Sequence, residues 1–133
     1  MKIVILDSHA LLTFFEKERG WEIVAEALRQ AAEEKIKLLI PVINWGEVIY
    51  VTLKEYDEHY AEILLNAMKN MPIEIVEVNK ELTLIAAHWK SRGGLSYADC
   101  FVVGLAEMKK ASEIITGDRE FLRTEKHVKI RWL

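Results

Sequence analysis

The amino-acid sequence predicts an α/β domain in which a mostly parallel central sheet lies between two layers of helices, a three-layer α/β/α sandwich. Short apolar runs alternate along the chain with longer segments of helical periodicity. The apolar runs are continuous, as expected of strands that are buried on both faces. No repeat, low-complexity segment or linker rich in proline and glycine interrupts this alternation. We therefore expect residues 1–133 to form a single domain, long enough to bury a core without a disulfide or a metal.

The first half of the chain begins with the run KIVIL, which predicts a strand over residues 2–6. Helices are predicted over 8–15 and 21–34, the second because its apolar residues recur on one face. The run KLLIP predicts a strand over 37–41, which its proline ends. A helix over 44–55 follows this strand.

The second half continues the alternation of helices and strands. The helix over 79–92 has the clearest limits, with Asn79 as its N-cap and Gly93 as its stop. The other predicted helices cover residues 57–70 and 96–110, and the remaining strands cover 73–78, 113–116 and 128–132. Because strands alternate with helices, most strands should run parallel to one another.

Composition and charge narrow the class of protein. Hydrophobic residues make up 51% of the chain and charged residues 29%, which argues against disorder. The single cysteine, Cys100, cannot form an internal disulfide, and neither a secretory signal nor a membrane-spanning run is present, so we expect a cytoplasmic setting. The net charge of −3 argues against general nucleic-acid binding. The basic residues from Arg119 onward form either a local binding patch or a solvated face.

Four acidic residues lie at the boundaries of predicted elements, namely Asp7, Glu47, Asp99 and Asp118. Each also has a local explanation, because aspartate, asparagine and serine cap helices. Asp7 or Ser8 can cap the first helix, the pairs Asn44–Glu47 and Ser96–Asp99 have capping-box spacing, and Asp118 can cap a short helix through Phe121.

The topology predicts that the four acids converge. Asp7, Glu47 and Asp118 follow strands and so lie at the carboxyl edge of a parallel sheet, while Asp99 begins a helix that returns antiparallel to the next strand. Sites in open α/β sheets form at this edge, where the strand order reverses. Four clustered carboxylates repel one another, which raises a pKa unless a cation is bound. Their hard oxygen ligands favour Mg²⁺ or Mn²⁺, and these ions point to phosphate-ester chemistry.

Four motifs resemble those of the PIN-domain nucleases, most closely the VapC-type toxins of prokaryotic toxin–antitoxin pairs. They are ILDSHALL with Asp7, NWGEV with Glu47, LSYADCFVVGLA with Asp99 and ITGDREF with Asp118. The similarity extends over essentially the whole chain. It implies a PIN-like fold and an endoribonuclease that depends on Mg²⁺ or Mn²⁺, with these four acids as the acidic quartet. It also implies a small antitoxin that inhibits the protein, and a homodimer, the commonest oligomer.

Neighbouring residues receive supporting roles from the same resemblance. Ser8 and Thr116 match positions that often carry small hydroxyl residues, and Thr116 can hold a carboxylate or a metal-bound water. Asn44 stands where the family often has serine or threonine, and we expect it to cap its helix. Ser96 is expected to cap the helix of Asp99 and thereby fix that acid. Arg119 and His9 are candidates for contact with the substrate.

Three alternatives to a toxin nuclease stay open at this point. The acids can serve only as caps in an interaction module without activity. A receiver-type signalling domain also places acids and Mg²⁺ at a sheet edge, but its phosphoacceptor aspartate should end the third strand, where this chain has Asn79. A PIN nuclease can also process RNA outside a toxin system.

Overall fold

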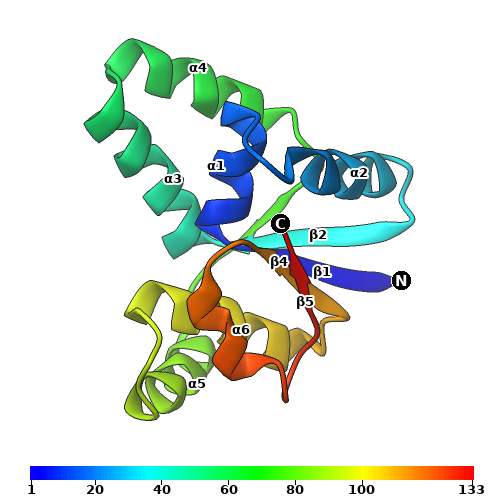
Figure 1. Cartoon of the computed structure of the whole chain (residues 1–133), viewed down its shortest axis with the longest axis vertical. Helices are drawn as coiled ribbons and strands as arrows, with labels where there is room; N and C mark the ends of the chain where they lie inside the picture. The colour runs from blue at the N-terminus through cyan, green and yellow to red at the C-terminus, as the bar shows by residue number, and fades with distance from the viewer.

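A computed structural model describes residues 1–133 and contains a five-stranded sheet in the order β3-β2-β1-β4-β5. The strands are β1 (Lys2–Leu6), β2 (Ile36–Pro41), β3 (Glu74–Val76), β4 (Glu113–Thr116) and β5 (Ile130–Trp132). Every strand pairing is parallel, so the sheet that was predicted to be mostly parallel is entirely so. The predicted three-layer α/β/α architecture is confirmed (Figure 1).

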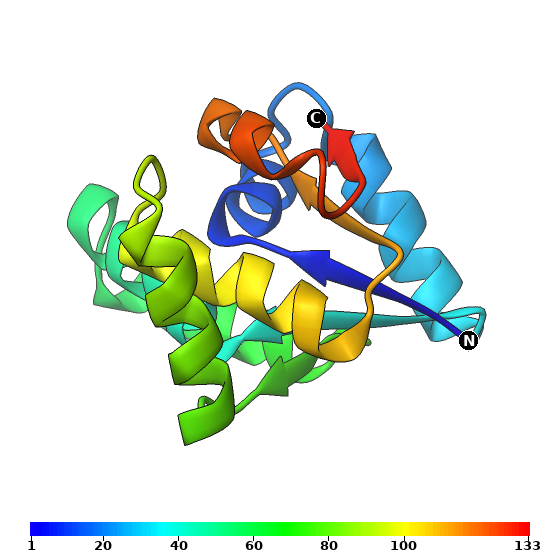
Figure 2. The same cartoon turned by 90° about the horizontal axis from the view of Figure 1, so that it is seen from below.

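Helices cover both faces of the sheet. They are α1 (Ser8–Glu16), α2 (Trp21–Ala32), α3 (Val42–Glu55), α4 (Glu58–Lys69), α5 (Lys80–Ser91), α6 (Tyr97–Lys109) and the short 3-10 helix η1 (Arg119–Thr124). Helices α1 to α4 lie on one side of the sheet, and α5 and α6 lie on the other (Figures 1 and 2). No helix has the length and apolar character that crossing a bilayer requires.

The central strand β1 shows how the sequence builds two cores. Val4 and Leu6 pack in the cluster that contains the α1 to α4 side chains, whereas Ile5 packs in the cluster of α5 and α6. Ile5 and Leu6 are fully buried. Side chains alternate between the two faces of a strand, and each fully buried apolar side chain contributes about 1.5–3 kcal/mol. The continuous apolar run therefore anchors helices on both faces at once.

Most element boundaries differ from the prediction by one or two residues, and three elements need comment. The strands β3 and β5 are three residues long instead of the predicted six and five, because each is an edge strand with a short stretch of partner. Helix α3 begins at Val42 and not at Asn44, because its N-cap is Pro41, whose backbone is extended at φ −64° and ψ 145°. Asn44 therefore lies inside the helix, and the prediction that it caps α3 is wrong.

The order of the strands creates a switch point beside β1. The chain leaves β1 toward β2 and β3 on one side and returns to β4 and β5 on the other. Because β1 and β4 are parallel neighbours, the residues that follow them emerge at the same sheet edge. Ligand sites of open α/β folds form in the crevice at such a switch point. The fold therefore brings Asp7, after β1, and Asp118, after β4, to this position.

Candidate functional site

Asp7 is held at the switch point by two hydrogen bonds. It is the N-cap of α1, and its Oδ1 accepts from the backbone N–H of Ala10 at 2.8 Å. Its Oδ2 accepts from the hydroxyl of Thr116, the last residue of β4. The Thr116 oxygen in turn accepts from the backbone N–H of Asp118 at 2.9 Å. One buried hydroxyl thus fixes the positions of two of the four acids, in keeping with its predicted supporting role.

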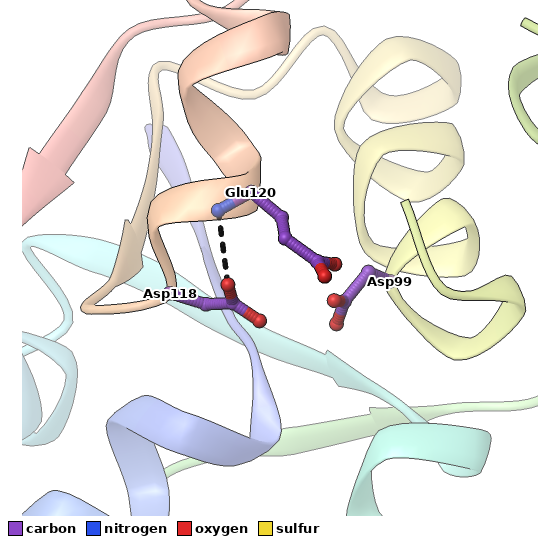
Figure 3. Close-up of side chains that lie close together, drawn as sticks. All are labelled: Asp99, Asp118 and Glu120. Atoms are coloured by element: carbon purple, nitrogen blue, oxygen red, sulfur yellow. Dashed lines mark hydrogen bonds between the residues drawn. The ribbon is translucent and has the colours of Figure 1, made fainter. Parts of the chain in front are cut away.

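Asp99 reaches the same edge from the first turn of α6. Ser96 caps this helix as predicted, and its hydroxyl oxygen accepts from the backbone N–H of Asp99 at 3.2 Å. The side chain of Asp99 is buried and points toward that of Asp118, which comes from the segment before η1 (Figure 3). Asp118 caps η1, as its Oδ1 accepts from the N–H of Glu120 at 3.0 Å. The cap and the site therefore use the same residues.

Three carboxylates form a compact cluster at this point. One oxygen from each of Asp99, Asp118 and Glu120 lies within 4.8 Å of the others. Figure 3 shows these carboxylates facing one another between η1 and the start of α6. Glu120 was not among the predicted site residues. Its only sequence signal was its position two residues after Asp118, in the first turn of a short helix.

Glu47 lies on α3, close enough to the cluster for its negative charge to contribute to the raised pKa of Asp99. Its Oε1 accepts from the side-chain amide of Asn44 at 3.1 Å. The same amide group donates to the carbonyl oxygen of Ala98 at 3.2 Å, which ties the first turn of α3 to the first turn of α6. Asn44 is fully buried and acts as a positioning residue for Glu47 instead of a helix cap.

Burial and mutual repulsion perturb two of the acids. Burial raises the pKa of Asp7 from its ordinary 3.8 to about 7, with a smaller contribution from the charges of Asp99 and Asp118 and opposition from its two hydrogen bonds. Burial, together with a smaller contribution from the charge of Asp118, likewise raises the pKa of Asp99 to about 7. Of the four predicted acids, only Asp99 and Asp118 belong to the compact cluster, whereas Asp7 and Glu47 lie outside it and interact with its members through their charges.

The remaining predicted residues surround this centre. Ser8 is the first residue of α1 and follows the capping Asp7. His9 is exposed and its ring lies against Gly117, where a Cβ would approach the ring carbon Cε1 to 2.4 Å. Arg119 is exposed, and its guanidinium lies 4.7 Å from the ring centroid of Trp132.

The donor set fits a hard divalent cation. Carboxylate oxygens are the preferred ligands of Mg²⁺ and Mn²⁺, and a bound cation would favour the charged forms of Asp7 and Asp99, which burial first and neighbouring negative charges second disfavour. The Oδ1 atom of Asn44 is the one buried side-chain polar atom of the chain that lacks a hydrogen-bond partner. Asn44 lies three residues before Glu47 on α3. Zinc is less suitable, because no cysteine or histidine joins the cluster.

Comparisons with known proteins identify the family and the fold of this chain. A model of the PIN domain family matches residues 4–127. A chain in the crystal structure of VapBC2 from Rickettsia felis, bound to a DNA fragment from their promoter, matches with a TM-score of 0.76 and 12% identity over 98% of each chain. DNA-bound VapBC from Salmonella typhimurium gives a TM-score of 0.74 and 17% identity, also over 98% of each chain.

A third structure, the sarcin-ricin loop cleaving toxin VapC20 from Mycobacterium tuberculosis, has a TM-score of 0.71 and 13% identity, over 91% of this chain and 94% of that one. A search of curated proteins finds no significant match. The structural similarities establish the shared fold, and the family match extends over nearly the whole sequence. This chain belongs to the PIN domain family.

Proposed function

We propose that this protein is an endoribonuclease that hydrolyses RNA phosphodiester bonds with Mg²⁺ or Mn²⁺ held by Asp7, Glu47, Asp99 and Asp118. The observation that supports this most strongly is the meeting of acids from three distant segments at the β1–β4 switch point. Capping explains each acid singly, but it does not require Asp99, Asp118 and Glu120 to lie within 4.8 Å of one another. Nor does capping require Asp7 and Asp99 to be buried, and this burial raises the pKa of both groups and so disfavours their charged forms.

The chain's own residues hold the site in position. Thr116 orients Asp7 and anchors the backbone of Asp118, Ser96 anchors the backbone of Asp99, and Asn44 orients Glu47. A bound divalent cation polarises the phosphoryl group and lowers the pKa of a water. The carboxylates of Asp7, Glu47, Asp99 and Asp118 would hold this cation and, through it, the phosphate of the substrate. His9, on the rim beside Gly117, is placed to contact the substrate.

The test is cleavage of a structured RNA by the purified protein with Mn²⁺, with EDTA and in the Asp99→Asn variant. We expect cleavage that EDTA abolishes and that the variant reduces at least about 100-fold. The matched control is Glu107→Gln, which removes an exposed acid near the other end of α6. Activity in Asp99→Asn equal to that of the wild type would refute the proposed site. Absence of cleavage in every metal would favour the non-catalytic interaction module.

We further propose that the protein acts in the cytoplasm as the toxin of a toxin–antitoxin pair. The similar structures from Rickettsia felis and Salmonella typhimurium are of VapBC, and a further similar structure is of VapBC-1 from nontypeable Haemophilus influenzae. On this chain, α3 and α4 form a helical hairpin that extends away from the sheet (Figure 1). Its large exposed apolar side chains are Ile43, Tyr50, Leu53, Tyr56 and Ile63. Such a surface suits an amphipathic segment of a small antitoxin.

Expression of this protein alone and together with a small protein encoded by an adjoining reading frame tests this role. We expect growth arrest that co-expression relieves, and a stable complex that Tyr50→Ser weakens without changing RNA cleavage by the free protein. Growth without arrest, with cleavage intact in vitro, would instead favour an RNA-processing nuclease. The expected homodimer is measured by light scattering on the free protein.

A further inference from the structure

A basic cleft adjoins the acidic cluster. It has a volume of about 780 Å³ and lies between the α5–α6 loop and η1, which run close together in both views (Figures 1 and 2). The charged residues that line it are three cations and one anion, namely Lys90, Arg119, Arg123 and Glu120. Ser96, which caps the helix of Asp99, also lines it. The cleft therefore begins where the acidic cluster ends.

The three cations of this cleft have no acidic partner. The ion pairs of the protein involve only the cations Arg29, Lys35, Lys129 and Arg131. The cleft cations are held in other ways. Lys90 donates through Nζ to the carbonyl oxygen of Leu95 at 2.9 Å, and Arg119 lies over the ring of Trp132. In a protein of net charge −3, three unpaired cations around one cleft make a local positive surface.

Gly94 sets the position of the third cation. Its φ is +89°, and a Cβ at this position would lie 2.4 Å from Cδ and Nε of Arg123 and 2.6 Å from Cζ. The arginine side chain thus lies directly on the Gly94 backbone, in a space that only glycine leaves free. The neighbouring Gly93 also has a positive φ, +77°, but a Cβ there would meet nothing within 4 Å.

We propose that this cleft binds the sugar-phosphate backbone of the RNA strand beside the scissile bond, with Lys90, Arg119 and Arg123 contacting phosphates and Gly94 positioning Arg123. The inference rests on the proposed nuclease function and adds the path of the substrate to it. Phosphate contacts fix the register of a bound strand without reading its sequence. A strand held in the cleft therefore presents a phosphodiester to the adjoining acids. The acids themselves repel RNA, so the attraction must come from neighbouring cations.

RNA binding as a function of salt tests the cleft directly. Fluorescence anisotropy with a labelled single-stranded RNA is measured in the Asp99→Asn background, which separates binding from cleavage. We expect Arg123→Gln and Lys90→Gln each to weaken binding about fivefold at 0.1 M salt and to reduce the slope of log K against log salt by about 0.7. Lys37→Gln, which removes an exposed unpaired cation at the opposite end of the sheet, should change neither quantity.

Substitutions at Gly93 and Gly94 provide a second test, which separates the effect of the position of the Arg123 side chain from the effect of its charge. Gly94→Ala should displace the flexible end of the Arg123 side chain and weaken RNA binding by less than Arg123→Gln does, and the double variant should bind no more weakly than Arg123→Gln alone. Gly93→Ala carries similar backbone strain without touching Arg123, so it should bind as the parent does. Equal binding by Gly94→Ala and Gly93→Ala would overturn the role of Gly94.

If Lys90→Gln and Arg123→Gln left the affinity for RNA and its salt dependence unchanged, the proposal that this cleft binds RNA would be overturned. Cleavage by the wild-type protein would then still support the nuclease function, so the two failures are distinguishable. In the wild-type background the cleft variants should raise KM more than they lower kcat, because contacts to the phosphates that flank the scissile bond are made before and during the reaction alike.

Discussion

Asp7→Asn should make the metal-free protein more stable at pH 8. Asp7 is only 1% exposed, and its pKa stands at about 7 in the folded protein against an ordinary 3.8. A carboxyl group with this difference destabilises the folded state by about 4 kcal/mol at pH 8. The amide keeps the acceptor for Ala10 but weakens the bond with Thr116, which costs about 1 kcal/mol. The expected net gain in the free energy of unfolding is about 3 kcal/mol.

The gain should depend on pH in a defined direction. Between pH 4 and pH 7 the folded protein binds more protons at Asp7 than the unfolded chain does, so the free energy of unfolding falls as the pH rises. The asparagine variant lacks this titration. Its advantage should therefore be about 2–3 kcal/mol larger at pH 8 than at pH 5.

Urea denaturation in EDTA at both pH values measures this difference. The matched control is Asp57→Asn, because Asp57 is another capping aspartate that accepts a backbone N–H at 2.8 Å but is exposed. We expect no gain from it. Addition of Mn²⁺ should stabilise the wild type more than Asp7→Asn, since the variant loses a ligand. The reasoning would be refuted if Asp7→Asn were no more stable than the wild type at pH 8, or if the difference in the free energy of unfolding were the same at the two pH values. Asp7 would then not be a buried carboxyl group with a raised pKa.

Three further substitutions test the supports of the site. Thr116→Val removes the donor to Asp7, so the pKa of Asp7 should rise further and cleavage at pH 7 should fall about tenfold, measured as a pH–rate profile. Asn44→Asp places a second charge beside Glu47 and removes the amide donor, so the metal-free protein should lose about 2–3 kcal/mol in urea, part of which Mn²⁺ restores. Glu120→Gln should weaken Mn²⁺ binding about tenfold by calorimetry if its carboxylate joins the ion.

Two exposed positions provide controls for these changes. Asn66→Asp makes the same chemical change as Asn44→Asp on the surface of α4 and should leave stability within about 0.5 kcal/mol. Glu107→Gln should leave Mn²⁺ affinity unchanged. Full Mn²⁺ affinity in Glu120→Gln would exclude Glu120 from the ion's ligands while leaving the four predicted acids as candidates.

Three of the four acids that sequence reasoning found share one property: Asp7, Asp99 and Asp118 lie at or near element boundaries that periodicity can locate, whereas Glu47 lies inside α3. Asp7 follows a continuous apolar strand, and Asp99 and Asp118 begin helices. Asn44 shows the limit of this approach, because an Asn and a Glu three residues apart have the same spacing at a helix start and inside its first turn. The spacing predicted that Asn44 caps α3, whereas the N-cap is Pro41, three residues earlier. The side chain of Asn44 is therefore free to donate hydrogen bonds to Glu47 and to the carbonyl oxygen of Ala98.

The sequence alone determined the alternation of strands and helices, the two-faced burial of β1 and the edge at which the acids gather, because local periodicity and parallel topology dictate all three. Only the tertiary structure decided which side chains touch. Glu120 meets Asp99, and Gly94 meets Arg123, because η1 folds back across the start of α6. These partners are far apart in the chain, and no local rule of propensity, capping or spacing encodes such a contact. It arises from the packing of whole elements against the sheet, which also turns separate helix caps into one acidic centre beside a basic cleft.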